Sequence, residues 1–225
     1  MTSAATRRDL TDPDTDLPAL QQLTGRLWPR QPRFHIGELT WRRFQHAGRE
    51  PEWPTAWWER DGRVLAWGWA EPPSELEMQV DPATGELVAE VLGWFDTHAT
   101  GTRREVTVMD SETHLVDGLR GRGYRPIDDG PFFVHLRRDL DDIPRPVVPR
   151  GYRLRPVRDE SDAAHRAAAH AAAFSIPGRP SRVTETSYRQ LMRRWPYDPG
   201  LDWMVTDADD RAAAFCLIWM DEENA

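Results

Sequence analysis

The sequence has 225 residues, which suits one large domain or two ordinary ones of about 100–150 residues each. Hydrophobic residues make up 39%, which is slightly low, but eleven tryptophans offset this because each buries a large apolar area. A net charge of −8 and a pI near 5.4 argue against proteins that bind nucleic acid or anionic membranes. The single cysteine, Cys216, allows no disulfide framework within one chain, and no apolar run approaches membrane-spanning length. We therefore expect a soluble, cytoplasmic protein.

The first third of the chain predicts two helices and a hairpin. After a start signal at residues 12–16, leucines recur at helical spacing. The Asp61-Gly62 pair is typical of a two-residue hairpin turn. The predicted elements are a helix ending before Pro29, a helix over 38–48, and strands over 55–60 and 63–70.

The stretch from Glu75 to Ala99 organises the rest of the first half. Residues 75–80 alternate polar and apolar side chains, which predicts a half-buried strand. Residues 81–85 have turn composition, and a helix pattern begins at Glu86. A strand that enters a helix through a short glycine-containing turn directs free N–H groups at one point, where a phosphate can bind. An ordinary strand–turn–helix without a ligand explains the same pattern.

The order of elements then restarts after a Pro-rich stretch. Residues 141–151 lack an apolar face and predict a semi-rigid linker. Before this linker we predict a strand at 104–109, a helix at 111–122 capped by Asp110, and a strand at 132–136. After it we predict a strand at 152–156, helices at 160–174 and 185–195, and strands at 201–206 and 212–220. This strand–helix–helix–hairpin order also begins the chain, so we predict a weak internal repeat.

This order resembles the GNAT fold of Gcn5-related N-acetyltransferases, and its doubling resembles tandem GNAT proteins. The specific points are the strand end Val80-x-Pro82, the Gly123-Tyr124 pair, which resembles the Gly-Phe ending of the family's fourth helix, and the first-strand-like segment 153–156. The resemblance implies an α/β (α+β) fold with a GNAT-like mixed central sheet flanked by helices, and a tandem repeat with the second copy truncated. It places a GNAT-like domain with a degenerate acetyl-CoA loop at 1–140, the linker at 141–151, and half of a second GNAT-like domain at 152–225.

The resemblance also implies a reaction, the transfer of an acetyl group from acetyl-CoA to a primary amine of a small molecule or peptide. This chemistry needs the thioester beside the amine, an N–H group on its carbonyl oxygen, a base for the amine and an acid for the thiolate. In GNAT proteins the splayed end of the fourth strand supplies N–H groups, and an Arg/Gln-x-x-Gly-x-Gly/Ala loop holds the pyrophosphate.

Candidate site residues follow from the same resemblance. The candidate catalytic residues are Glu75, Glu77 and Tyr124; those for acetyl-CoA binding are Met78, Gln79, Val80, Thr84, Gly85 and Glu86; and those for acceptor binding are Phe174, Ile176 and Arg179. A solvated strand face also explains the two glutamates on the strand. The seven histidines show no metal-ligand spacing, so we predict no metal site.

The sequence departs from the family pattern at the cofactor loop. The residues after Pro82 lack the arginine, the second glycine and the full loop length, and Glu86 puts a carboxylate where a pyrophosphate would bind. We therefore predict no detectable acetyl-CoA binding by this chain, and the alternative function is a non-catalytic GNAT-like binding or scaffolding module. An unpaired edge and an uncovered apolar face at strand 212–220 predict self-association. A complete cofactor motif encoded after Ala225 would make the chain a fragment of an enzyme.

Overall fold

The computed structural model describes residues 3–28, 30–130 and 132–224, which divide into two compact units. Unit 1 takes the residues up to His35, Pro51–His135 and Asn224, and unit 2 takes Ile36–Glu50 and Leu136–Glu223. This division differs from the predicted boundaries of 1–140, 141–151 and 152–225. Ile36–Glu50 and the residues from Leu136 through the predicted linker group with the second unit, and Asn224 groups with the first.

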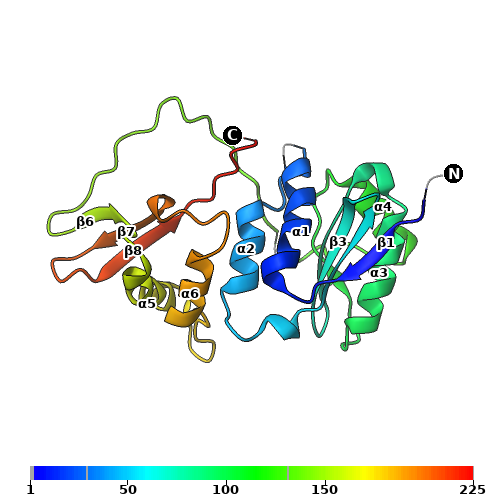
Figure 1. Cartoon of the computed structure of the whole chain (residues 1–225), viewed down its shortest axis with the longest axis horizontal. Coiled ribbons are helices and arrows are strands. Elements are labelled where there is room, and N and C mark those ends of the chain that lie inside the picture. Colours follow the sequence, from blue (N-terminus) through cyan, green and yellow to red (C-terminus); the bar gives the residue numbers. More distant parts are fainter. Residues whose placement is uncertain (1–2, 29, 131, 225) are drawn as a thin grey trace. The chain divides into compact units, whose positions relative to one another are not determined.

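Unit 1 is a five-stranded mixed sheet with helices on both faces, as predicted (Figure 1). The strand order is β1-β2-β3-β4-β5, and all neighbours are antiparallel except the parallel pair β4–β5. Helix α1 lies on one face, and α3 and α4 lie on the other (Figure 1). The elements are β1 Thr6–Asp9, α1 Pro13–Leu27, β2 Thr55–Arg60, β3 Arg63–Glu71, β4 Glu75–Val80, α3 Leu87–His98, β5 Glu105–Val106 and α4 Thr113–Gly121.

Strand β3 explains why the two faces take different helices. Trp67 is fully buried and its Nε1 donates to Thr24 Oγ1 of α1 at 3.2 Å. On the other face the strand carries the small residues Ala66, Gly68 and Ala70, and a Cβ at Gly68 would lie 2.9 Å from Val91 and Trp94 of α3. Trp67 of β3 therefore packs toward α1, whereas large side chains of α3 pack on the small residues of the same strand.

Unit 2 is a three-stranded antiparallel sheet in the order β6-β7-β8, with α5 and α6 on one side (Figure 1). Helix α2 joins this unit by packing against α6. Gly37 at its start allows the Trp219 ring to approach so closely that a Cβ there would overlap the ring. The elements are α2 Ile36–Phe44, β6 Arg153–Pro156, α5 Ala163–Phe174, α6 Glu185–Met192, β7 Asp202–Thr206 and β8 Ala212–Leu217. Short 3-10 helices are η1 Glu50–Glu52, η2 Pro82–Thr84, η3 Glu160–Asp162 and η4 Pro199–Leu201.

The hairpins of the two units share one irregularity. In β2–β3 the register shifts between Trp58 and Glu59, and in β7–β8 it shifts between Val205 and Thr206, in each case next to the hairpin turn. The pair Trp58↔Ala66 therefore corresponds to Val205↔Ala214. The predicted internal repeat is present in the order of elements, strand–helix–helix–strand–strand, and also in this β-bulge.

Two predicted strands differ from the structure, and one observed strand was not predicted. The predicted strand 132–136 is wrong, because these residues form no strand, and Phe132 and Leu136 are 84% and 90% exposed. The strand predicted over 104–109 is limited to Glu105–Val106, since later backbone groups bond to side chains instead. Strand β1 was not predicted, because its sequence TRRD has no apolar alternation.

Other boundaries are closer to expectation. Helix α1 begins after Asp12, whose side chain accepts the N–H of Asp14, as the start signal predicted. The cap predicted at Asp110 is wrong, because Glu112 takes the N-cap position of α4 and its carboxylate is engaged elsewhere. The linker residues 141–151 contain neither helix nor strand, in agreement with their proline content.

Candidate functional site

The loop between β4 and α3 is closed on itself by Asp81. The Asp81 carboxylate accepts the N–H of Ala83 at 3.1 Å, and its backbone carbonyl accepts the N–H and hydroxyl of Thr84 at 2.8 and 3.0 Å. The guanidinium groups of Arg26 and Arg63 pair with the same carboxylate at 3.5 and 3.3 Å. The loop therefore presents a neutralised carboxylate, and its first N–H groups are already bonded.

Strands β4 and β5 form two parallel pairs, Glu75↔Glu105 and Leu76↔Val106. Beyond them residues 77–80 and 107–109 are unpaired with one another, and a space separates the two segments. We call this space the strand gap. By the resemblance to GNAT proteins, the strand gap corresponds to the splayed end of that family's fourth strand, where a thioester meets backbone N–H groups. It is therefore the place to look for a cofactor site.

Arg33 occupies the strand gap and bonds to both of its sides. Its guanidinium donates to the carbonyl oxygen of Met78, to that of Thr107 at 2.6 Å and to the Glu112 carboxylate at 2.7 Å. Glu77 lies 3.5 Å from the same group. Both Arg33 and Glu112 are buried, so the gap holds an internal ion pair.

Glu112 completes this ion pair by accepting the N–H of Met109 at 2.8 Å. The Arg33 guanidinium also lies 4.4 Å from the centre of the Phe34 ring. A buried charge pair is stable only when its remaining donors and acceptors are bonded, and here backbone carbonyls, a backbone N–H and an aromatic face meet that need.

The residues predicted to bind acetyl-CoA lie around the loop at Asp81 and the strand gap. The Val80 carbonyl oxygen lies 2.9 Å from His114 Nε2, and the Gln79 side chain accepts from Thr24 and Trp67 on the α1 face. Glu86 is exposed and lies 3.6 Å from Arg60. The remaining predicted residues are Met78, bonded to Arg33, Thr84, bonded to Asp81, and Gly85, which lies beside His114.

The predicted catalytic residues lie on two elements, with Glu75 and Glu77 on β4 and Tyr124 after α4. Glu75 is exposed at the start of β4, and Glu77 is half-buried beside Arg33. Tyr124 follows α4 and packs against the hydrophobic cluster on the α3 side of the sheet. Burial raises the pKa of its phenol, and Asp96 adds to the rise, so the hydroxyl keeps its proton at neutral pH.

The predicted acceptor residues lie at the end of α5 in unit 2. Phe174 is 60% exposed, and its ring stacks on His170 at a centroid distance of 4.5 Å. Ile176 and Arg179 close a tight turn by exchanging two backbone hydrogen bonds of 3.1 and 2.9 Å. The three residues are neighbours in one surface segment, but the turn of the latter two is bonded to itself.

His170 lies beside this segment and was not predicted as a site residue. Its Nδ1 lies 2.9 Å from Ser181 Oγ. Its ring centre lies 5.5 Å from that of Trp41 and 5.9 Å from that of Phe215. Burial, together with the positive charges of Arg166 and His46, lowers the pKa of His170 to about 4. No local pattern signals this arrangement, since Trp41 comes from a helix 129 positions earlier in the chain (170 − 41).

A buried polar cluster supports the sheet of unit 2. Asp202 accepts from Arg166 Nε at 3.0 Å and from the hydroxyl groups of Tyr188 and Tyr197. The Arg166 guanidinium also lies 3.6 Å from the Phe215 ring centre. Burial raises the pKa of both tyrosines, so they act as hydrogen-bond donors to the carboxylate.

One group in unit 2 has the composition of a metal site. Asp162, His165 and Asp210 place their ligand atoms within 4.8 Å of one another. Both carboxylates are paired with Arg155 and Arg158 at 2.6 to 3.2 Å. Burial opposes the ionisation of Asp162, but hydrogen bonds from the two arginines hold its pKa below the usual range. Through Arg155, strand β6 is therefore linked to Asp162 of η3 and to Asp210 of the β7–β8 turn.

Unit 1 has a shallow pocket of about 400 Å³ on the β3 side of the loop at Asp81. Its charges are balanced, since two arginines and two aspartates line it: the residues are Arg60, Asp61, Arg63, Leu65, Asp81, Ala83 and Thr84. No helix in the described part of the chain has the length and apolar composition needed to cross a membrane.

Searches of protein-family models and of curated proteins found no match for the sequence. Solved structures do match. An aminoglycoside N-acetyltransferase in complex with CoA shares 16% identity over 60% of this chain and 98% of its own, with a TM-score of 0.40. An aminoglycoside acetyltransferase from an uncultured soil metagenomic sample shares 13% identity over 60% and 97%, with a TM-score of 0.39.

A tandem GNAT protein from the clavulanic acid biosynthesis pathway shares 14% identity and covers 94% of this chain and 73% of its own, with a TM-score of 0.44. Similarity at this level concerns the fold alone, so the function proposed below depends on the contacts of this chain. The solved structures to which the chain is similar include GNAT acetyltransferases, among them a tandem GNAT protein.

Proposed function

We propose that this chain is a non-catalytic GNAT-like module whose first unit does not bind acetyl-CoA. One observation carries the proposal: the Arg33 guanidinium fills the strand gap and bonds to Met78 on one side and Thr107 on the other. A thioester entering the gap would have to displace a buried ion pair. Separating Arg33 from Glu112 would leave a buried carboxylate without its partner, at about 3–5 kcal/mol.

The loop at Asp81 supports the same proposal. A pyrophosphate gains its affinity from N–H groups and cationic side chains, but here the Ala83 and Thr84 N–H groups and two arginines are bonded to Asp81. Losing two or three charge-assisted hydrogen bonds at roughly 1.5–3 kcal/mol each weakens binding by about 3–9 kcal/mol. At about 1.4 kcal/mol per tenfold change, that loss weakens micromolar affinity to about 0.1 mM at the lower bound and to more than about 1 mM over most of the range.

Calorimetric titration of the full chain with acetyl-CoA tests this function. We expect no binding heat at concentrations up to about 1 mM, which corresponds to about −4 kcal/mol. Micromolar binding that Gly85→Asp abolishes would contradict the proposal. The position accepts a side chain without a clash, because a Cβ at Gly85 would meet only the Cβ of His114, at 3.7 Å. Asp61→Asn, on the hairpin turn beside the same loop, is the matched control that should leave any such binding unchanged.

A second candidate function is acetyl transfer from acetyl-CoA to a primary amine of a small molecule or peptide. The parallel pair β4–β5 that diverges after two residue pairs favours it, because that is the arrangement in which a thioester can lie beside backbone groups. A thiol-release assay with acetyl-CoA and a panel of amines separates the two candidates. Turnover that Glu77→Gln lowers by about tenfold or more would favour the transferase.

A further inference from the structure

Ser181 and His170 of unit 2 form a hydrogen-bonded pair that the proposed function does not use. The serine Oγ lies 2.9 Å from Nδ1 of the histidine, and it also accepts the N–H of Val183 at 3.3 Å. Because that N–H occupies a lone pair of Oγ, the hydroxyl proton is free to point at the ring, and we assign the hydroxyl as the donor to Nδ1. In this arrangement an imidazole can take the proton of a serine that attacks a carbonyl group.

The loop that carries Ser181 is fixed by its own hydrogen bonds. Its N–H donates to Ser175 Oγ at 2.9 Å, and Ser175 directly follows α5. Between these two serines, Ile176 and Arg179 close the tight turn described above. The loop is therefore tied back to the end of the helix that carries His170, so the hydroxyl is held in position against the ring.

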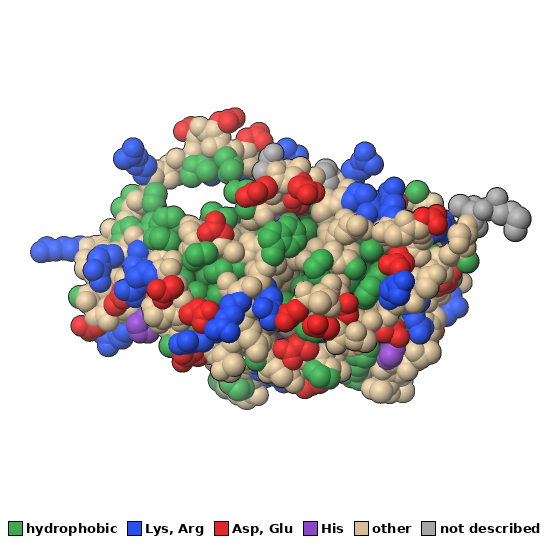
Figure 2. Space-filling view, in the orientation of Figure 1, with side chains coloured by type: hydrophobic (Ala, Val, Ile, Leu, Met, Phe, Trp, Pro, Cys, Tyr) green, Lys and Arg blue, Asp and Glu red, His purple; other side chains and the backbone are tan. Residues whose placement is uncertain are grey.

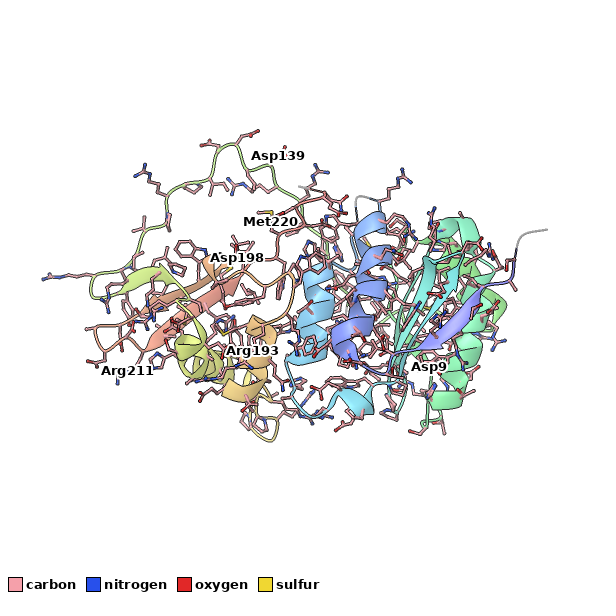
Figure 3. The ribbon with its side chains drawn as sticks, in the orientation of Figure 1. Asp9, Asp139, Arg193, Asp198, Arg211 and Met220 are labelled. Carbon is pink, nitrogen blue, oxygen red and sulfur yellow. The ribbon has the colours of Figure 1, made fainter. Side chains whose placement is uncertain are left out.

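Aromatic rings hold the imidazole of His170 from several sides. Phe174 stacks on it, with ring centres 4.5 Å apart, and the centres of Trp41 and Phe215 lie 5.5 and 5.9 Å away. Figure 3 shows the side chains of this part of unit 2, with Arg193 labelled just after α6. Because Phe174 is largely exposed, an apolar group of a ligand can reach the pair from solvent along that ring.

The charges around His170 keep its ring in the form that accepts a proton. Burial, Arg166 on α5 and His46 after α2 hold its pKa near 4, so the ring is neutral at neutral pH. The adjoining loop is basic, because residues 175–183 contain Arg179 and Arg182 and no acidic residue. Positive surroundings disfavour protonation of the ring and attract anionic ligands.

The composition of the chain leaves few groups that could compete with this serine. The sequence contains no lysine, so every side chain in the Lys and Arg colour of Figure 2 is an arginine. Guanidinium groups stay protonated, and hydroxyl groups without a neighbouring base are weak nucleophiles at neutral pH. The main competitor among side chains is the single thiol, at Cys216.

We propose that Ser181 is a self-acylation site, which accepts the acyl group of an activated carboxylic ester with His170 as the base. Nδ1 takes the hydroxyl proton, Oγ forms a bond to the carbonyl carbon, and the bond from that carbon to the leaving oxygen breaks. The proton then passes to the leaving oxygen, which restores the neutral ring and leaves an ester on the serine. The modification occurs once per chain, uses no CoA, and does not depend on whether unit 1 binds acetyl-CoA.

Reaction of the full chain with p-nitrophenyl acetate tests the proposal. Nitrophenol release gives the rate, peptide mass spectrometry identifies the acetylated residue, and a Cys216→Ala background removes the thiol. We expect about one acetyl group per chain, on Ser181. His170→Gln should lower the rate at this serine about a hundredfold. His165→Gln, an exposed histidine on the same helix, is the matched control that should leave the rate unchanged.

The pH profile of the parent chain decides the question even if His170→Gln fails to fold. With a base whose pKa is about 4, the rate at Ser181 should be constant between about pH 6 and about pH 8. A serine without a base would instead react about tenfold faster for each pH unit, in proportion to hydroxide. Such a rise, an unmodified Ser181, or an equal rate in the His170→Gln variant would overturn the proposal.

Discussion

The two units use a buried arginine for different tasks. In unit 1, Arg33 lies between two strands of the sheet and substitutes for the backbone pairing that β4 and β5 lack beyond Leu76 and Val106. In unit 2, Arg166 lies beneath the sheet, between Asp202 and the Phe215 ring. One arginine fills the strand gap of unit 1, and the other supports the helix-covered face of the sheet of unit 2.

The same contrast extends to the sheet faces. In unit 1 both faces carry helices, and the α3 face is lined by Ala66 and Gly68. In unit 2 the aligned residues, Ala214 and Cys216, are exposed. Within the described residues, the two copies of the repeat thus share strand register and a β-bulge but differ in which sheet faces are covered.

The largest effect should come from breaking the buried ion pair of unit 2. Arg166→Met removes the cation from Asp202, which is fully buried, and should lower the free energy of unfolding by about 3–5 kcal/mol. Urea denaturation measures the loss, and hydrogen exchange of β7 peptides localises it. The double variant Arg166→Met/Asp202→Asn should recover part of it. A loss below about 1 kcal/mol would show that the pair has no such role.

A matched pair of substitutions on the α3-type faces should give the next largest difference. Gly68→Val places side-chain atoms where Val91 and Trp94 lie, and should destabilise unit 1 by about 1–3 kcal/mol. Cys216→Val, at the aligned position of unit 2, enters open space and should change stability by about 0.5 kcal/mol or less. Thermal unfolding of the two variants compares them directly, and equal losses would mean that the side of β8 that carries Cys216 is also tightly packed.

The fold was predictable where local patterns determine it. Alternation located β4, the Asp61-Gly62 turn located the β2–β3 hairpin, and alanine content located α5. Residues 132–136 have strand composition but form no strand, and the edge strand β5 contains only two residues, which leaves little edge for pairing. Strand propensity alone does not reveal the length of the neighbouring edge.

The site was less predictable because its central contact is not local. Arg33 and Glu112 are 79 positions apart, and Arg33 lies in a polar, Pro-containing loop that shows no periodicity. What the sequence did reveal is the loop that lacks a phosphate-binding arginine. The structure adds that Asp81 bonds the N–H groups of that loop.

The next effect in size should be a pH dependence of the stability of unit 2. The pKa of His170 is about 4 in the folded protein, against 6.5 as its ordinary value, so the unfolded chain binds more protons between these values. Its contribution to stability should therefore be complete above about pH 6.5 and be lost as the pH falls to about 4. Because the side chain is only half-buried, solvent screening limits the loss to about 1–2 kcal/mol.

Urea denaturation at about pH 7 and about pH 5 measures this loss, and His170→Gln should abolish it. Asp162, whose pKa is held below its ordinary 3.8 by Arg158 and Arg155 against the effect of burial, loses its contribution only at lower pH. The two windows are therefore separable. A pH dependence that stays the same in the His170→Gln variant would contradict the assignment to this histidine.

The smallest effects should come from the helix starts, and they again differ between the units. In unit 2, Thr184 and Ser187 form a reciprocal capping box, with bonds of 3.1 Å from the Ser187 N–H and 2.8 Å from the Thr184 N–H. In unit 1, Asp12 accepts the Asp14 N–H at 3.0 Å, and Asp16 independently accepts the N–H groups of Thr11 and Asp12.

Because Ser187 is fully buried, removal of the Thr184 hydroxyl leaves a buried N–H without its acceptor, so Thr184→Ala should cost about 1–2 kcal/mol. Asp12→Ala leaves the exposed start of α1 with Asp16 in place and solvent available, so it should cost about 0.5 kcal/mol. Thr184→Ser keeps the acceptor oxygen and should stay close to the parent. Thermal unfolding of the three variants orders them, and a larger loss for Asp12→Ala than for Thr184→Ala would show that burial does not set the cost of a lost cap in this chain.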